Sequence, residues 1–334
     1  MTISLEKLSK VTTVITHAHC PDGMMSALLA RDGLCWRSPT PTQPLDIRFI
    51  QHGTDEHRNL DATPGMLFVD FAPPVKRADS FVAAGAIVLD HHKTTESLVA
   101  QFGENGVFGD EVKDPGVCGA TLVYRHVWLP MMDGVDLPES FKLRVEYMTR
   151  LAGIRDTWVK TADDWREACK QAEILLFMPK ERWLSMTLRE IVYKWDADFG
   201  WIGDVELEKH EESVTRAAAE AWRCTSSGGT RMALITGGLH TVSDASQLLE
   251  DIDLVVAVRY TVKDGKPTLI CSTRTKANYD CKKLAEFYGG GGHTKAAGFS
   301  VPVYPGDTNP FSRVMELVGT FESPYPHDRY VFPS

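Results

Sequence analysis

Short apolar runs alternate with helical patterns along the first half of the chain. The runs predict strands at 11–16 (VTTVIT), 47–50, 66–69 (MLFV) and 86–89 (AIVL), and helices are predicted at 24–31, 117–129, 139–153 and 163–178. A strand buried on both faces is apolar throughout, whereas a strand with one face in water alternates. The order of these elements therefore predicts an α/β fold, with a parallel sheet covered by helices on both faces.

The second half contains a smaller α/β pattern. A charged, alanine-rich segment at 204–223 predicts a connecting helix, and SSGG at 226–229 breaks the chain after it. Strands are predicted beyond it at 232–236, 254–260 and 268–272, and helices near 243–250 and 280–288. A chain of 334 residues is long enough for two domains. We therefore predict a domain at 1–200, a connector at 201–228 and a second domain at 229–334.

Composition and charge narrow the class of protein. The chain is 43% apolar and 24% charged, and no apolar run reaches the roughly 18 residues that a membrane span needs. The first residues lack the apolar core of a secretory signal, and the seven cysteines form no CxxC pair. We therefore expect a cytoplasmic protein with reduced thiols, without a zinc finger or an iron–sulfur cluster. A net charge of −9 argues against a broad basic surface for long nucleic acid.

Acids and histidines gather where the predicted strands end. His17, His19 and Asp22 follow the first predicted strand, and Asp70 follows the third. Asp90, His91 and His92 follow the fourth strand, and Asp156 follows a predicted helix. The carboxyl ends of parallel strands meet at one edge, so these segments should line one crevice. Carboxylates so close together repel one another unless cations compensate them. Mixed Asp and His ligands suit Mn²⁺ better than Ca²⁺, and two ions about 3.5–4 Å apart would activate water and stabilise a phosphoryl oxygen.

Each of these residues also has a purely structural interpretation. Asp70 taken alone fits a helix cap or a turn, and His19 alone fits an ordinary loop histidine. The remaining histidines are predicted to be structural or surface residues: 52, 57, 126, 210, 240 and 327. Three polar residues directly after a β-branched strand are harder to explain by structure alone. The four segments together therefore favour the metal site.

Two of the motifs resemble a known family. The triplet Asp90–His91–His92 and the later segment GGGGHTKAAGF at 289–299 stand in the order found in the DHH phosphoesterases. The chain resembles this family over nearly its whole length, and in particular its short-oligonucleotide (nanoRNase or oligoribonuclease-like) branch. The resemblance implies a parallel-sheet DHH domain, a smaller DHH-associated domain, and an active site in the cleft between them. It also implies two Mn²⁺ ions, with Mg²⁺ or Co²⁺ as alternatives.

The resemblance assigns roles residue by residue. The implied metal ligands are His17, His19, Asp22, Asp70, His91 and Asp156. Asp70 would bridge both ions, His92 would touch the reacting phosphate, and Asp90 would orient a histidine, so that His92, Asp90 and Asp70 form the catalytic set. The first motif departs from the commoner pattern of two aspartates two residues apart. Here His17, His19 and Asp22 stand in its place, and the usual first aspartate is a histidine.

The glycine segment is the predicted substrate site of the second domain. Four glycines allow backbone N–H groups to approach a phosphate closely, although GGGG also fits a flexible linker. The residues after it predict the start of a helix and then a strand. By resemblance, Arg274 and His293 would contact substrate together with Gly290, Gly291 and Gly292. The earlier segment GVCGATLV at 116–123 fits either an anion site at a helix start or tight helix packing.

The family resemblance defines a reaction class and leaves several substrates open. We expect hydrolysis of phosphoester bonds in short oligonucleotides or linear dinucleotides, with 3′-phosphoadenosine 5′-phosphate as a further candidate. The alternatives are a cyclic-dinucleotide phosphodiesterase, a single-strand exonuclease, an exopolyphosphatase, and a nucleotide-binding module that has kept the fold without catalysis. We expect no long double-stranded nucleic acid and no membrane as partners, and a homodimer remains open.

Overall fold

The chain divides into two compact units. The computed structural model describes residues 3–36, 45–52, 54–236, 241–263, 265–303 and 309–323. The units are Met1–Leu207 and Glu208–Ser334, and helix α12 (Gly200–Ala219) runs through the boundary. Within the described residues, no helix is long and apolar enough to cross a membrane.

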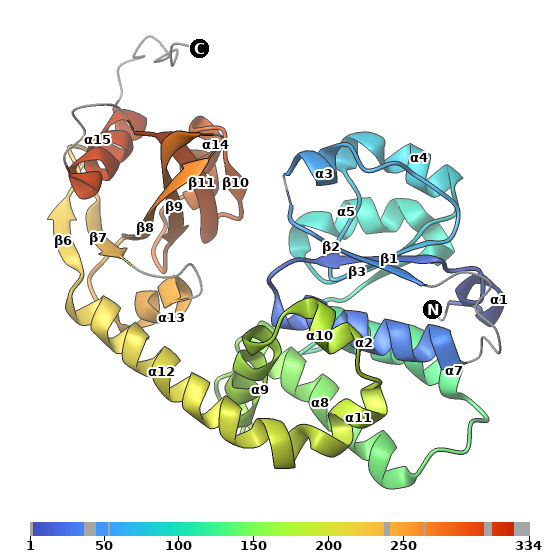
Figure 1. Cartoon of the computed structure of the whole chain (residues 1–334). Coiled ribbons are helices and arrows are strands. Elements are labelled where there is room, and N and C mark those ends of the chain that lie inside the picture. Colours follow the sequence, from blue (N-terminus) through green and yellow to red (C-terminus); the bar gives the residue numbers. More distant parts are fainter. Residues whose placement is uncertain are drawn as a thin grey trace. The chain divides into compact units, whose positions relative to one another are not determined.

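The first unit is built on a parallel sheet, as predicted (Figure 1). Its strands lie in the order β2-β1-β3-β4-β5, and each pair of neighbours in the described sheet is parallel. The strands are β1 (Thr13–His17), β2 (Asp46–Ile50), β3 (Met66–Val69), β4 (Ile87–Asp90) and β5 (Gly106–Phe108). Strand β3 is buried along its whole length: Leu67 packs into one core cluster and Phe68 into another on the opposite face. The fully apolar strands therefore reflect a sheet covered on both faces.

Helices on the two faces complete these clusters. Leu28 of α2 and Val145 of α8 pack on one face, and Phe81 of α4 and Leu98 of α5 on the other (Figure 1). The helices of this unit are α1 (Leu5–Leu8), α2 (Pro21–Trp36), α3 (Asp55–Arg58), α4 (Ala78–Ala83), α5 (Glu96–Val99), α6 (Gly119–Val123), α7 (Leu129–Met132), α8 (Glu139–Asp156), α9 (Trp165–Phe177), α10 (Lys180–Leu184) and α11 (Leu188–Lys194). A π-helical segment, Tyr124–Trp128, joins α6 to α7. The predicted α/β fold with helices on both faces is confirmed.

Strand register places three of the predicted site residues at one edge of this sheet. Val69 of β3 pairs with Leu89 of β4, and the N–H of Asp70 donates to the carbonyl oxygen of Leu89 at 3.0 Å. His17 ends β1, Asp70 follows β3 and Asp90 ends β4. Because the strands are parallel, all three side chains leave the sheet at its carboxyl edge.

The second unit contains a mixed sheet. Its described strands lie in the order β10-β11-β9-β8-β7-β6; β7 and β8 are parallel, and the other neighbours are antiparallel. They are β6 (Trp222–Thr225), β7 (Arg231–Thr236), β8 (Leu254–Lys263), β9 (Lys266–Arg274), β10 (Gly291–Gly292) and β11 (Ala296–Pro302), and the helices are α13 (Thr241–Leu248), α14 (Cys281–Phe287) and α15 (Pro310–Glu322). Leu284 of α14 and Val314 of α15 share one core cluster, and Val242 of α13 belongs to another. The unit therefore buries both faces of its sheet.

Two local predictions are wrong, each for a physical reason. Residues 293–295, predicted as a helix start, form the turn of a hairpin in which His293 and Ala296 exchange backbone hydrogen bonds at 2.7 and 3.1 Å. Residues 222–223, predicted as the end of a helix, lie in β6 (Trp222–Thr225), which pairs with β7. The SSGG segment at 226–229 is the turn between these two strands, so it lies inside the second unit. In the two wrong predictions, tertiary strand pairing prevailed over local propensity.

Candidate metal centre

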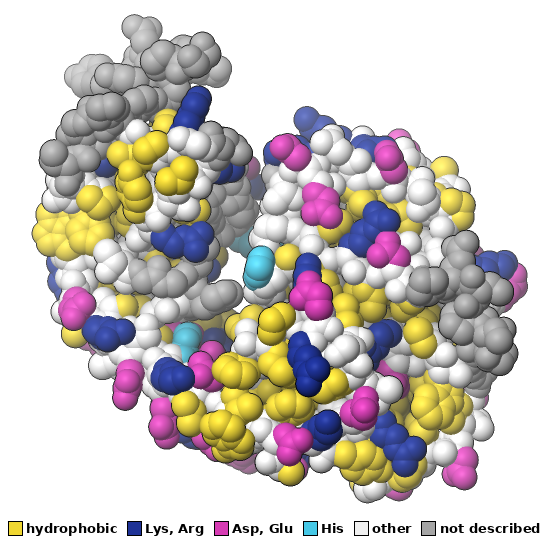
Figure 2. Space-filling model, in the orientation of Figure 1, with side chains coloured by type: hydrophobic (Ala, Val, Ile, Leu, Met, Phe, Trp, Pro, Cys, Tyr) yellow, Lys and Arg dark blue, Asp and Glu magenta, His cyan; other side chains and the backbone are white. Residues whose placement is uncertain are grey.

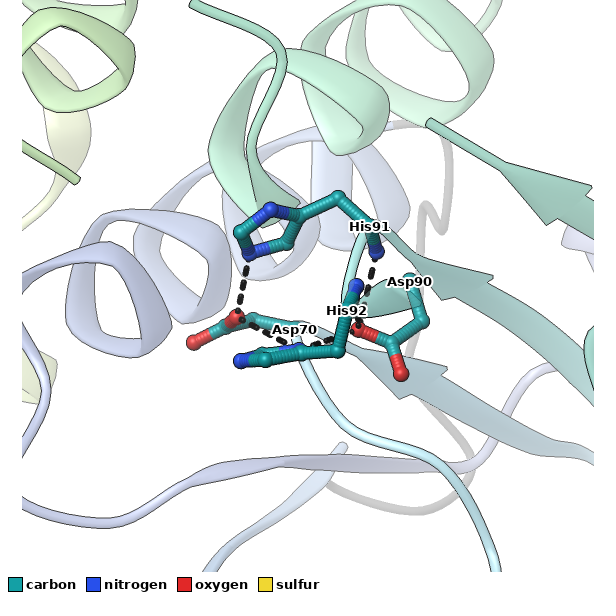
Figure 3. Close-up of side chains that lie close together, drawn as sticks. All are labelled: Asp70, Asp90, His91 and His92. Atoms are coloured by element: carbon teal, nitrogen blue, oxygen red, sulfur yellow. Dashed lines mark hydrogen bonds and ion pairs between the residues drawn. The ribbon is translucent and has the colours of Figure 1, made fainter. Parts of the chain in front are cut away.

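Asp70 lies beside both histidines of the polar cluster at the sheet edge (Figure 3). Its side chain is 1% exposed, and its backbone has φ of 52°, an unusual left-handed conformation for a residue with a β-carbon. The Oδ1 atom lies 3.3 Å from Nε2 of His91. The Oδ2 atom is buried and has no hydrogen-bond partner in the part of the chain that the structure describes. A buried carboxylate oxygen without a partner costs free energy unless a ligand satisfies it.

His91 lies between three carboxylates. Its Nε2 atom is 3.3 Å from Asp70 Oδ1, 3.4 Å from Asp156 Oδ2 and 4.0 Å from Asp22 Oδ2. Ligand bonds of about 2.1 Å would put ligand atoms about 3 to 4.2 Å from one another around a single ion. The spacing of these four side chains therefore fits the coordination sphere of a small divalent cation.

Glu111 holds His91 from the other side. Its Oε1 atom lies 3.0 Å from Nδ1 of His91, and its side chain is about half exposed. A proton on Nδ1 shared with Glu111 leaves Nε2 with a lone pair for a metal ion, which is the support that metal-binding histidines usually have. Burial alone would lower the pKa of His91, but the hydrogen bonds with Asp70 and Glu111 raise it to about 12 in the metal-free protein. Sequence reasoning missed Glu111, because nothing in its loop distinguishes it from a surface acid.

Asp90 binds His92, and both lie in the polar cluster with Asp70 (Figure 3). Its Oδ1 lies 2.7 Å from Nδ1 of His92 and accepts the His91 backbone N–H at 2.9 Å, and Oδ2 accepts the Thr95 hydroxyl at 2.7 Å. Burial would raise the pKa of Asp90, but the hydrogen bond and charge of His92 lower it to about 2. Burial would likewise lower the pKa of His92, and Asp90 raises it to about 9. The two side chains form an ion pair that fixes the imidazole.

Asp22 links the sheet edge to the start of α6. Its two carboxylate oxygens accept the N–H groups of Gly119 and Ala120 at 2.7 and 2.8 Å. The backbone donors of this helix start, for which we considered an anion ligand, are therefore used by a carboxylate of the protein itself. Even so, burial and the charge of Asp70 raise the pKa of Asp22 to about 7.

The remaining carboxylates show the same crowding. Burial and the charge of Asp22 raise the pKa of Asp156, the last residue of α8, to about 6. Burial also raises the pKa of Asp70. Carboxyl groups whose ionisation is opposed by burial and by one another are the groups that a bound cation would stabilise in their charged form.

The described side chains contain three sets whose potential ligand atoms lie within 4.8 Å of one another. The sets are Asp70 with Asp90, His91 and His92; Asp22 with His91 and Asp156; and His17 with Cys20 and Asp70. They share Asp70 and His91, so they form one continuous centre. The donors are imidazole nitrogens, carboxylate oxygens and one thiol, a mixture suited to a divalent transition metal. The residues present thus fit a metal ion, and their overlapping sets fit two.

In the loop after β1, the residues near Asp70 differ from those that we predicted as ligands. Nδ1 of His17 lies 3.9 Å from Oδ2 of Asp70, within the centre. His19 is exposed, has φ of 57° and belongs to none of the three sets formed by the described residues. Cys20, which sequence reasoning did not consider, lies in the set with His17 and Asp70. The role of His19 as a ligand stays a prediction, without support from its position.

Two histidines assigned to structural or surface roles lie next to this centre. The His52 ring stacks on Phe71 with centroids 4.0 Å apart and lies 5.3 Å from the His17 ring. His57 packs edge-on against Phe71 and its Nε2 lies 3.2 Å from the Ala72 carbonyl oxygen. Desolvation by the neighbouring rings, with the charge of His17, lowers the pKa of His52. No signal in the sequence indicated this packing.

The predicted substrate residues of the second unit lie on one hairpin and the strand beside it. Arg274, at the end of β9, donates from Nε to Ser243 Oγ at 2.9 Å and from Nη1 to Ser272 Oγ at 3.1 Å. A β-carbon at position 290 would overlap the Gly298 carbonyl, and one at 292 would lie 2.5 Å from Ala297 Cα. Gly290 and Gly292 are thus required for close packing on β11. Gly291 and His293 are exposed in the same hairpin.

Charged groups elsewhere on the surface are intermixed. On the face shown in Figure 2, Lys and Arg side chains alternate with Asp and Glu and form no continuous basic stripe. Many of them pair: Arg48 lies 2.6 Å from Asp46, and Lys282 and Lys283 lie 3.8 and 3.3 Å from Glu286 and Asp280. Lys282 and Lys283, which follow the predicted substrate strand, therefore have acidic neighbours.

Comparison with solved structures shows what the chain is similar to in fold. A DHH-domain protein whose description places it in a family of ribosomal proteins matches with a TM-score of 0.57 and 14% identity over 94% of this chain and 87% of its own. A pGpG-specific phosphodiesterase from Vibrio cholerae matches with a TM-score of 0.49 and 13% identity, over 93% of this chain and 98% of its own. An exopolyphosphatase-related protein from Bacteroides fragilis matches with a TM-score of 0.47 and 12% identity, over 95% of this chain and 93% of its own. No protein-family model and no curated protein matches the sequence. The chain therefore has the fold of a DHH-domain protein.

Proposed function

We propose that the chain is a metal-dependent phosphohydrolase that cleaves phosphoester bonds of small nucleotides. The observation that carries the proposal is the environment of Asp70: a buried carboxylate with one unpartnered oxygen, shared by two sets of potential metal ligands among the described residues. Side chains that crowd negative charge without a compensating cation are characteristic of a cation site. The DHH-domain fold supports the proposal, because the fold places these residues at the carboxyl edge of a parallel sheet.

Six residues of the first unit would bind the metal ions or orient a ligand. His17, Asp22, Asp70, His91 and Asp156 would hold the ions, and Glu111 would orient His91. Two divalent ions, Mn²⁺ by family resemblance, would supply Lewis-acid stabilisation of the phosphoryl group and a water of lowered pKa. Asp22 also holds the start of α6 against this edge, so the ligand geometry is built into the fold.

His92 is the residue that we assign to the reacting phosphate. Its Nδ1 is held by Asp90 at 2.7 Å, so its Nε2 is the atom that would donate a proton or hydrogen bond to a phosphate oxygen. In the metal-free protein Asp90 raises the pKa of His92, which favours the protonated ring that suits an anionic substrate. Asp90 acts through His92 and is a positioning residue.

The substrate class follows from charge and size. The net charge of −9 favours short substrates over long strands. Arg274 and the hairpin that carries His293 are the proposed contacts to the far part of the nucleotide. We therefore propose oligonucleotides of two to five residues or linear dinucleotides, with 3′-phosphoadenosine 5′-phosphate as a further substrate to test.

The test is a substrate panel with a matched control. Wild type and Asp70→Asn would receive Mn²⁺ and 5′-labelled RNA of two, five and 24 residues, 3′-phosphoadenosine 5′-phosphate, a cyclic dinucleotide and polyphosphate. Preferential loss of the dinucleotide in wild type, abolished in Asp70→Asn, is the expected result. Binding of nucleotide with no turnover of any substrate would contradict the proposal and favour a binding module, and cleavage of polyphosphate alone would favour an exopolyphosphatase.

A further inference from the structure

Cys20 lies inside the metal centre, although its residue type sets it apart from the other ligand candidates. Its sulfur, a ring nitrogen of His17 and a carboxylate oxygen of Asp70 all lie within 4.8 Å of one another. The Oδ2 atom of Asp70 lies 3.9 Å from Nδ1 of His17 and is the buried oxygen without a hydrogen-bond partner among the described residues. The set that includes this thiol therefore also contains the carboxylate whose second oxygen is unpartnered.

The loop that carries Cys20 is held in one conformation. The Thr16 hydroxyl donates to the Gly23 carbonyl at 2.9 Å, and a β-carbon on Gly23 would lie only 2.5 Å from the His17 carbonyl oxygen. Within this tight loop, His19 has a left-handed backbone and an exposed side chain, whereas Cys20 is half-buried. The loop therefore directs the sulfur, and not the imidazole of His19, toward Asp70.

We propose that Cys20 is a metal ligand, and that Cys20, His17 and Asp70 make one of the two ion positions a nitrogen, sulfur and oxygen site. The inference rests on the proposed metal centre and adds a ligand and a metal preference to it. Thiolate is a soft ligand that favours Zn²⁺, Co²⁺ or Fe²⁺ over Mn²⁺ and Mg²⁺. The other position, formed by Asp22, Asp156 and His91, offers mainly carboxylate oxygen and suits Mn²⁺ or Mg²⁺. The centre would then hold two unlike ions.

Among the described residues, Cys20 is the only partly accessible thiol in a set of potential metal ligands. Cys35, Cys169 and Cys224 are half-buried or exposed, and none belongs to a set of potential ligands there. A thiol next to an unpartnered buried carboxylate and an imidazole is thus distinguished by its neighbours. On binding, the thiol proton passes to solvent and the sulfur lone pair is donated to the ion, with no change of oxidation state.

Cobalt substitution reads the ligand directly. Metal-free protein would be titrated with Co²⁺, and the near-ultraviolet thiolate-to-cobalt charge-transfer absorption recorded for wild type, Cys20→Ser and the control Cys35→Ser. The absorption should develop in wild type and in Cys35→Ser and be lost in Cys20→Ser, whose fold is checked by circular dichroism. An absorption that is absent from wild type, or unchanged in Cys20→Ser, would overturn the proposal.

Exchange of the ligand tests the metal preference. Cys20→Asp keeps a donor at the position but makes it an oxygen, so its affinity for Zn²⁺ should fall at least about tenfold relative to wild type while its affinity for Mn²⁺ is kept or rises. Equal changes for both ions would contradict the preference. A thiolate signature in a protein that hydrolyses no phosphoester would leave this inference standing and remove the proposed function. Hydrolysis of a phosphoester without any thiolate signature would support the proposed function and overturn the inference about Cys20.

Discussion

Gly119 and Asp70 are in such close contact that no side chain fits between them. A β-carbon at position 119 would overlap the β-carbon of Asp70 and lie 2.7 Å from Oδ2 of Asp22. The Gly119 N–H donates to the same Asp22 oxygen at 2.7 Å. The start of α6 therefore reaches the carboxyl edge of the sheet only because residue 119 is glycine, and this contact couples the helix to two candidate metal ligands.

Substitution of this glycine should disturb the metal centre before it unfolds the protein. We expect Gly119→Ala to push Asp70 and Asp22 out of place, to lower the free energy of unfolding by about 1–3 kcal/mol and to weaken metal binding at least about tenfold. Gly200→Ala is the matched control, because a β-carbon there meets its nearest neighbour at an ordinary 3.7 Å. Calorimetric metal titration and urea unfolding measure both effects. Unchanged metal affinity in Gly119→Ala would show that the contact does not position the ligands.

Glu111 should affect metal binding without being a ligand. Its contact with Nδ1 of His91, at 3.0 Å, orients the ring toward the carboxylates. We expect Glu111→Ala to weaken metal binding about 10- to 100-fold, and Glu111→Gln, which keeps an acceptor oxygen, to weaken it less. Glu104→Gln serves as a control, because Glu104 is an exposed acid paired with Lys7. Calorimetry compares the three variants, and equal affinity in all of them would remove Glu111 from the centre.

The metal-free protein should lose stability as the pH rises from 6.5 to 9. Hydrogen bonds with neighbouring carboxylates outweigh burial and raise the pKa of His92 to about 9 and that of His91 to about 12, both above the roughly 6.5 of an unfolded histidine. A raised pKa means that the folded state holds the proton more tightly, so the stabilisation is lost as the pH rises through the folded-state pKa. Burial lowers the pKa of His17 to about 4, and the contact with His92 lowers that of Asp90 to about 2. These two shifts make stability increase with pH, but only below about pH 6.5, where unfolded histidine and aspartate still bind protons.

Urea unfolding in the presence of a chelator tests this pH dependence. The urea concentration at the unfolding midpoint should decrease as the pH is raised from 6.5 to 9. In His92→Asn this decrease should be smaller. Added Mn²⁺ should also reduce the fall, because an ion compensates the carboxylates and binds more tightly once the ligands are deprotonated. A metal-free protein that is as stable at pH 9 as at pH 6.5 would contradict the assigned shifts.

Arg274 should contribute to substrate binding more than to the chemical step. Its Nε and Nη1 atoms are held by Ser243, Ser272 and the Thr273 carbonyl, so the side chain is fixed at the end of β9. If it contacts the far part of the nucleotide, Arg274→Lys should raise KM about tenfold with kcat nearly unchanged. Steady-state kinetics on the dinucleotide measure this split. A fall in kcat at constant KM would place Arg274 in the chemistry instead.

The sheet of the first unit was predictable because its strands are apolar on both faces. The runs at 66–69 and 86–89 correspond to β3 (Met66–Val69) and β4 (Ile87–Asp90), and the polar triplet after the second run lies at the sheet edge. Local pattern was less reliable where pairing partners decided the structure. Strand β6 (Trp222–Thr225) continues a segment with strong helix propensity, and its pairing with β7 is a tertiary contact.

Side-chain direction limited what could be predicted of the site. Spacing alone could not show whether His19 or Cys20 faces Asp70, because that depends on the left-handed backbone at His19. Glu111 lies in a loop with other acids, and only the fold brings it to His91. The glycines at 290 and 292 were noted for phosphate binding, and the structure adds the close packing against β11 that makes glycine necessary.

The central claim is that Asp70 is the shared ligand of a two-ion hydrolytic centre. The most direct test measures bound Mn²⁺ by elemental analysis and dinucleotide hydrolysis on the same samples of wild type, Asp70→Asn and Asp46→Asn, across one metal titration. Asp46 is a matched control, since it is an exposed acid at the opposite end of the strands. We predict two ions and turnover in wild type and in Asp46→Asn, and fewer ions with loss of turnover in Asp70→Asn. Unchanged metal content and turnover in Asp70→Asn would contradict the account.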